Sequence, residues 1–117
     1  MLAVAQSVNL NAVGDTVATL INGASNVSVQ SIIVANASIS LTTAQLAVHT
    51  GAGATGTAIK TAYALNANTS SAKVVVTSAT STDLISVPKL YLRCTTAQGA
   101  AATADIFIYG YDLTILS

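Results

Sequence analysis

Apolar and polar residues alternate with a period of two along much of this chain, a pattern that indicates half-buried β-strands rather than helices. The clearest case is residues 89–95. One side of this segment carries Leu90, Leu92 and Cys94, and the other carries Tyr91 and Arg93. We therefore predict a strand here, with Cys94 packed in the core as a small apolar side chain.

The last alternating segment spans residues 104–113. Ile106 and Ile108 fall on one side of it, and aromatic residues fall on the other. Residues 96–103 contain Gln98-Gly99, which predicts a hairpin turn between the two segments. The outward side chains would then form one exposed face or pack against a second sheet. Aromatic residues with Arg are enriched in interface cores, so the candidate interface residues are Tyr91, Arg93, Phe107, Tyr109 and Tyr111.

Strand-forming Val, Ile and Thr recur between clusters of Ser, Asn and Gly, which favour turns. In residues 27–35 we expect Val27, Val29 and Ile33 on one face, and Asn22-Gly23 just before them marks a tight turn. Residues 57–65 are rich in Ala, so strand and helix both remain open there. Further strands are expected at residues 16–21 and 72–77, and residues 36–41 and 46–50 are interpreted as two short strands or one bent strand.

Some seven to nine short strands at this spacing predict an all-β fold, a single β-sandwich or jelly-roll-like domain of antiparallel strands. We assign residues 16–117 to the sandwich. Residues 1–15 are interpreted as an N-terminal arm or an edge strand, and an extended arm could reach a neighbouring subunit.

Charged residues are scarce: they make up 7% of the 117 residues, with four bases, four acids and a net charge of zero. A typical domain carries about 25%. So little charge gives weak repulsion between copies, and we interpret it as a sign that much of the surface is covered. The alternative is a free monomer kept soluble by Ser, Thr and Asn.

The same composition bears on partners. Four dispersed bases matched by four acids do not supply the counterion replacement that nucleic acids or anionic membranes require. Neither a membrane-spanning segment nor a signal peptide is predicted, because the apolar runs are short and the first residues carry no basic segment. A single cysteine cannot form an internal disulfide.

Motifs for chemistry are weak. Residues 51–56 match G-x-G-x-x-G, but no acid follows about 20 residues later and no strand–helix alternation follows, so a flexible loop is favoured. His49 has no Cys or acid at metal-ligand spacing and is interpreted as a strand-end residue, although a distant catalytic partner stays open. Asp83, Asp105 and Asp112 show no Ca²⁺-loop spacing and are interpreted as turn residues. We expect no enzymatic activity, catalytic residue, metal or cofactor.

Two stretches resemble small virion proteins of tailed bacteriophages: residues 90–113, LYLRCTTAQGAAATADIFIYGYDL, and residues 31–41, SIIVANASISL. The family includes capsid decoration, or cement, proteins. The resemblance implies a β-sandwich or jelly roll that binds the outside of an assembled head as a homotrimer and clamps neighbouring capsomers. Its implied partner is the major capsid protein, and its implied location is the capsid surface after synthesis in the host bacterial cytoplasm. A head-fibre, tail or adhesin module that binds a host receptor or glycan is the alternative.

Overall fold

The computed structural model of the protein describes residues 1–69 and 71–114. Within them the chain forms eight strands, and the alternation of buried and exposed residues follows the period of two expected from the sequence. The strands are β1 (Ala3–Asn9), β2 (Gly14–Thr19), β3 (Val27–Ala35), β4 (Gln45–Gly51), β5 (Thr55–Ala64), β6 (Val74–Ser78), β7 (Lys89–Thr96) and β8 (Thr103–Asp112).

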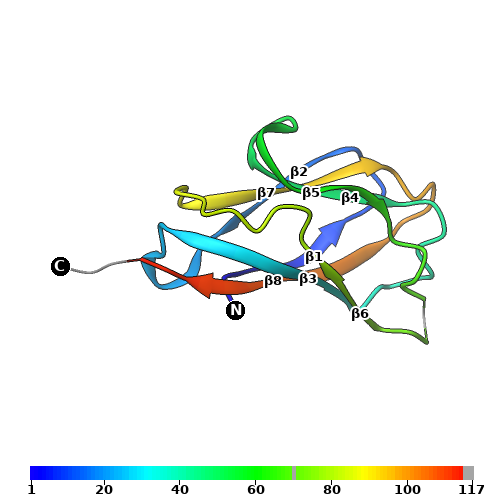
Figure 1. The fold of residues 1–117 in the computed structure, drawn as a ribbon. Coiled ribbons are helices and arrows are strands. Elements are labelled where there is room, and N and C mark those ends of the chain that lie inside the picture. The colour runs from blue at the N-terminus through cyan, green and yellow to red at the C-terminus, as the bar shows by residue number, and fades with distance from the viewer. Residues whose placement is uncertain (70, 115–117) are drawn as a thin grey trace.

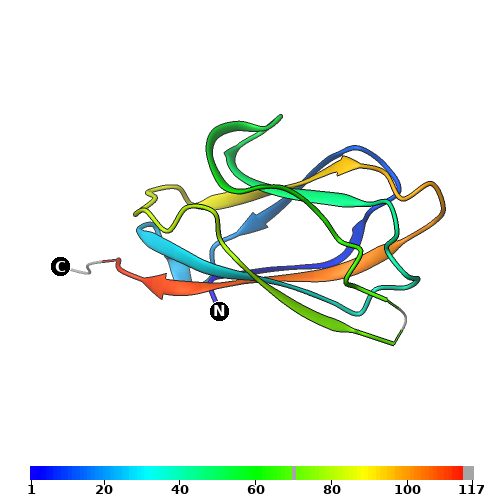
Figure 2. The same cartoon turned by 45° about the vertical axis from the view of Figure 1, so that its right-hand side comes forward.

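These strands form two four-stranded antiparallel sheets that lie face to face (Figures 1 and 2). One sheet has the order β1-β8-β3-β6 and the other the order β2-β7-β4-β5. Strand β1 pairs with β8, β2 with β7, β3 with β6, and β4 with β5, so the first half of the chain wraps against the second half in reverse order. This wrapping is that of a jelly roll, and the predicted all-β sandwich is confirmed.

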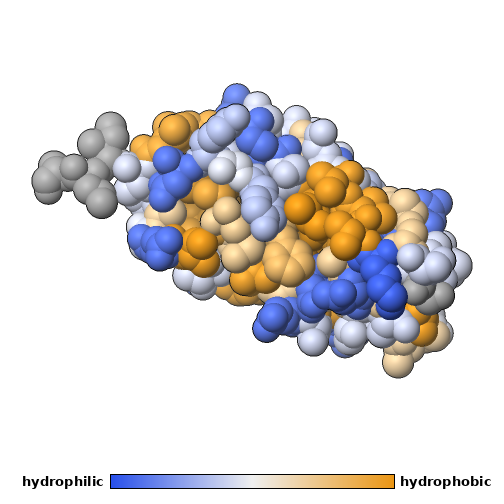
Figure 3. All heavy atoms as spheres, turned by 90° about the horizontal axis from the view of Figure 1, so that it is seen from below, coloured by the Kyte–Doolittle hydropathy of each residue, from blue (hydrophilic) through white to orange (hydrophobic). Residues whose placement is uncertain are grey.

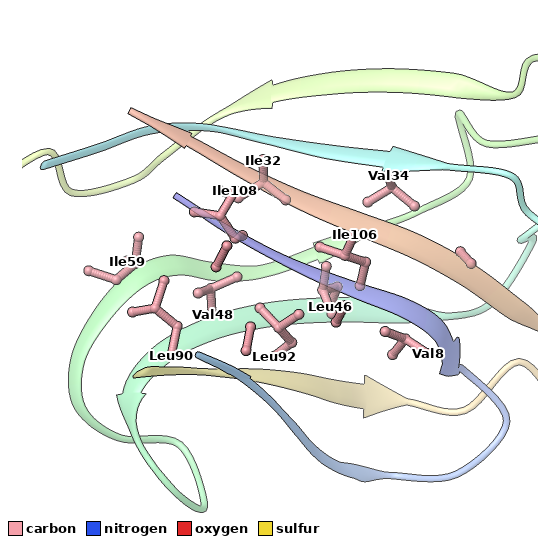
Figure 4. Packing of buried hydrophobic residues seen from close by; sticks show 14 of the residues in the cluster. Val8, Ile32, Val34, Leu46, Val48, Ile59, Leu90, Leu92, Ile106 and Ile108 are labelled. Carbon is pink, nitrogen blue, oxygen red and sulfur yellow. The ribbon is translucent and has the colours of Figure 1, made fainter. Parts of the chain in front are cut away.

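The core lies between the sheets and consists of the inward side chains of both (Figure 4). Leu90 and Leu92 of β7 and Ile106 and Ile108 of β8 are fully buried, as their alternation predicts. Cys94 is buried beside them, which confirms its expected place in the core. Opposite sheets thus supply the two best alternating segments of the sequence.

A bulge in β3 changes which of its residues face the core. Val29 pairs with Gly110 and Ser31 pairs with Tyr109, so Gln30 is the extra residue. Val27 and Val29 are buried before the bulge, but after it the buried residues are Ile32 and Val34. The prediction that Ile33 shares a face with Val27 and Val29 is therefore wrong, because the bulge reverses the alternation and turns Ile33 outward.

The N-terminal residues belong to the sandwich rather than to a free arm. Strand β1 is an edge strand paired with β8, and Leu2, Val8 and Leu10 are buried in the core. The boundary expected after Asp15 falls inside β2, which is the edge strand of the other sheet. Deleting residues 1–15 would consequently remove core side chains, the whole of β1 and the first two residues of β2.

The backbone geometry decides three of the local predictions made from the sequence. The ambiguous residues 57–65 lie almost wholly in strand β5, not in a helix. The expected turn at Asn22-Gly23 is present within a short 3-10 segment, where both residues have positive φ, 57° and 67°. Residues 36–41 form a loop rather than a strand.

Candidate functional site: an apolar sheet surface

The outer surface of the β1-β8-β3-β6 sheet is apolar where an antiparallel sheet normally turns polar residues to water. Cross-strand pairing aligns Val4 with Phe107, Phe107 with Ile33, and Ile33 with Val76, so one apolar row crosses all four strands. We call this surface the apolar face and define it by Val4, Ile33, Val74, Val76, Phe107 and Tyr109. Figure 3 views the molecule from this side and shows apolar atoms gathered there.

Exposure on the apolar face rises toward β6, the edge strand. Val74 and Val76 are 65% and 60% exposed, and Tyr109 of β8 is 39% exposed. Between them lies a shallow hollow of about 290 Å³, lined by Ile33, Ala35, Asn36, Val74, Phe107 and Tyr109. Five of these six lining residues are apolar or aromatic, so the hollow suits an apolar side chain of a partner better than a charged small molecule.

The polar rim of this hollow is satisfied within the molecule. The Asp105 carboxylate accepts hydrogen bonds from the Ser7 backbone N–H and from the Asn36 side-chain amide, both at 2.8 Å. These two bonds, the Ser7 one foremost, lower the pKa of Asp105. Ser7 and Asn36 both adopt positive φ, 52° and 56°. Asp105 therefore holds two strained backbone positions instead of offering its charge to a ligand.

The five predicted interface residues do not share a face. Tyr91 and Arg93 lie on β7 in one sheet, whereas Phe107, Tyr109 and Tyr111 lie on β8 in the other. The expected hairpin at Gln98-Gly99 is also wrong, because the segment between β7 and β8 crosses from sheet to sheet. Phe107 and Tyr109 belong to the apolar face, and Tyr111 is exposed near the end of β8.

On the opposite side of the sandwich, Arg93 forms an ion pair with Asp15, with 3.1 Å between the guanidinium Nη1 and the carboxylate Oδ1. The other Asp15 oxygen accepts the Gly53 backbone N–H at 2.8 Å. The pKa of Asp15 is lowered, chiefly by this hydrogen bond from the Gly53 backbone and further by Arg93 and the nearby His49. Gly53 sits at the tip between β4 and β5, so the glycine-rich motif is a hairpin loop fastened to β2.

His49 and Cys94 both lie in strands of the β2-β7-β4-β5 sheet. His49 lies on β4 opposite Tyr91 and is half-buried, and its Nδ1 atom is buried without a hydrogen-bond partner among the described residues. The Cys94 thiol lies near the carbonyl oxygens of Leu10 and Thr96, at 3.7 and 3.3 Å. Burial raises the pKa of this thiol, which keeps it in the unreactive protonated form.

Sequence reasoning missed most of the apolar face. Simple alternation places Ile33 on the face of Val27 and Val29 because the bulge in β3 leaves no mark in the sequence, and no pattern distinguishes Val4. Val74 and Val76 were recognised only as strand formers. The available signal was the run Val74-Val75-Val76, whose unbroken apolar character does not by itself say which side faces water.

Among residues 1–69 and 71–114, no group of three or more His, Cys, Asp or Glu side chains is arranged to hold a metal ion. In the same part of the chain, no helix is long and apolar enough to cross a membrane. Comparison with protein families, with curated proteins and with solved structures finds no match to this chain.

Proposed function

We propose that this protein is a structural component of a phage virion that binds and stabilises the outside of the capsid. It would act as a decoration, or cement, protein, in the form of a symmetric oligomer, with the major capsid protein as its partner. The observation that carries the proposal is the apolar face, because a surface of this kind on a small soluble fold marks a site that another protein covers. The resemblance in residues 31–41 and 90–113 supplies the virion context.

Binding energy would come chiefly from burying the side chains of the apolar face. Complete burial of an exposed Val or Phe contributes about 1.5–3 kcal/mol, so partly exposed side chains such as Val74, Val76 and Tyr109 contribute somewhat less each. A protein that binds only the assembled shell stabilises it by mass action, by about 2.7 kcal/mol per site at a hundredfold excess over Kd. Because the same contact is repeated at many equivalent sites, a modest binding energy per site is sufficient to stabilise the shell.

The distribution of charge fits a molecule with one covered side. The basic residues within strands, Lys60, Lys89 and Arg93, all lie in the β2-β7-β4-β5 sheet. The strands of the other sheet contain no base and carry acids only on β8, at Asp105 and Asp112. We infer that the apolar face meets the shell while the charged sheet faces water.

The number of copies in purified particles tests this proposal. A decoration protein is expected at on the order of hundreds of copies per particle, as its symmetry-related sites require. About six or twelve copies would instead indicate a tail or fibre position, and absence from the particle would refute both roles.

A second measurement locates the contact. Recombinant protein is added back to particles that lack it, and bound protein is quantified after sedimentation. Tyr109→Asp places a charge on the apolar face and should abolish binding, whereas the matched control Val17→Asp, on the exposed side of β2, should bind like the unmodified chain. His49→Ala should also bind normally, since no catalytic role is proposed. Equal binding by Tyr109→Asp and the unmodified chain would contradict this contact.

A further inference from the structure

The four edge strands of the sandwich differ in how they are protected against pairing with another chain. Natural edge strands carry charges, bulges or distortions that prevent such pairing. Strand β1 contains a bulge between Ala5 and Val8, β2 contains Asp15, and β5 contains Lys60 and several register shifts. Strand β6 has no charged residue within its bounds, Lys73 lying just before its first residue, and it pairs with β3 without any shift.

Hydrogen bonds at both ends of β6 show which of its backbone groups face outward. The Lys73 carbonyl accepts the Asn36 N–H, so residue 73 points its backbone toward β3. The Ser78 carbonyl accepts the Lys60 ammonium of β5 at 2.7 Å, so residue 78 points away from β3. Because backbone direction alternates along a strand, Val74 and Val76 direct their N–H and C=O groups to the free edge.

We propose that β6 pairs antiparallel with β6 of a second copy of this chain, about a two-fold axis at Val75. In this register Val74 lies opposite Val76 of the partner subunit, and Val76 lies opposite Val74 of the partner subunit. Both pairs exchange their free backbone hydrogen bonds, and the Ser78 carbonyl keeps its bond to Lys60. The two sheets join into one continuous antiparallel sheet.

The side chains support the same register. Val74 and Val76 are the most exposed valines of the structure's described part. In the dimer, the Val74 side chain of one copy would pack directly against the side chain of Val76 of the partner subunit. The two-fold axis is perpendicular to the sheet, so the apolar faces of both copies lie on the same side. An isologous contact of this kind closes at two copies and does not propagate into fibres.

This inference stands on the strand edge and does not require the proposed function, because it concerns the free chain in solution. If the proposed function also holds, the joined apolar faces are the surface that meets the shell. The two-fold contact differs from the three-fold arrangement that the virion resemblance implies, and the mass of the free oligomer separates them.

Sedimentation equilibrium of the purified full chain over a wide concentration range tests the contact. We expect a monomer–dimer equilibrium. Val76→Lys places a charge on the pairing edge and should raise the dimer Kd by about tenfold or more, because an ammonium group would oppose a valine side chain. Val17→Lys, at an exposed valine on the β2 edge, is the matched control and should leave the Kd unchanged.

A disulfide cross-link tests the register. Residues on the two-fold axis form a non-hydrogen-bonded pair with Cα atoms about 4.5 Å apart, which lies within the range that a disulfide spans. Val75→Cys should therefore give a covalent dimer on mild oxidation, while the Val17→Cys control should not, and the buried Cys94 does not compete. A monomer at every concentration, a trimer, or a dimer unaffected by Val76→Lys and not cross-linked by Val75→Cys would overturn the proposal.

Discussion

Gly110→Ala is the sharpest single test of how the sheet that carries the apolar face is built. Gly110 lies on β8 opposite Val29, immediately beside the β3 bulge. An added Cβ would overlap the carbonyl oxygen of Ser28 and would lie 2.9 Å from the Val29 Cα and 3.0 Å from the Gln30 N. All three atoms are backbone atoms of β3, so no flexible side chain can move aside.

The expected cost follows from this environment. Extra methyl groups in well-packed sites cost about 1–3 kcal/mol. Strand β3 is held on both sides, by β8 and by β6, so relaxation at the bulge would break pairing in the sheet. We therefore expect the upper part of that range, about 2–3 kcal/mol, and a decrease in Tm of about 10 °C for a domain of this size.

Urea unfolding followed by circular dichroism measures the loss. The midpoint should fall while the slope m stays constant, since the surface exposed on unfolding does not change. Gly23→Ala is the control: Gly23 has φ +67° but no atom within 4 Å of an added Cβ, so it reports only the cost of the left-handed backbone. If Gly110→Ala costs less than about 0.5 kcal/mol, the close approach of β8 to the bulge is refuted.

Three further predictions concern buried and titratable groups. Asn68→Ala removes the buried amide that donates to the Val34 carbonyl at 2.9 Å and should lower the free energy of unfolding by about 1–3 kcal/mol, measured by urea unfolding. The lowered pKa values of Asp15 and Asp105 mean that their stabilisation is present above the ordinary carboxyl pKa and is lost as the pH falls through the lower folded values. Calorimetry should therefore show Tm falling below about pH 4, less steeply in Asp105→Asn. Burial of Cys94 predicts that a thiol reagent reacts only as the protein unfolds, and rapid labelling of the native chain would contradict this placement.

Local patterns predicted the parts of this fold that depend on one strand at a time. The alternation in β7 places Leu90 and Leu92 inward and Arg93 outward without reference to any other strand. The same reasoning put Cys94 in the core and the turn at Asn22-Gly23 in the right place. Such features can be predicted from the sequence because side-chain direction and turn geometry are set within a few residues.

Features that depend on distant pairing could not be predicted in this way. β7 and β8 are neighbours in sequence but lie in different sheets, because β8 pairs with β1 and β3 instead. The outward direction of Ile33 depends on the bulge, which forms where Gly110 allows close approach. Both facts follow from contacts across the chain, and the predicted common face of β7 and β8 failed for that reason.

The wrapping of the jelly roll explains why the chain can carry an apolar face and still place its charges in water. Reverse-order pairing sends β7 and β8 to opposite sheets, so the bases of β7 separate from the aromatic residues of β8 by the thickness of the core. A hairpin of β7 and β8 would have mixed Arg93 with Phe107 and Tyr109 on one surface. Because the sheets separate them, one side of the sandwich holds the Asp15–Arg93 ion pair and the other carries an apolar row that crosses all four strands. The segregation of charge matters as well as its scarcity, since the strands of the β2-β7-β4-β5 sheet hold Asp15, Lys60, Lys89 and Arg93, whereas the strands of the other sheet hold only two acids, both on β8.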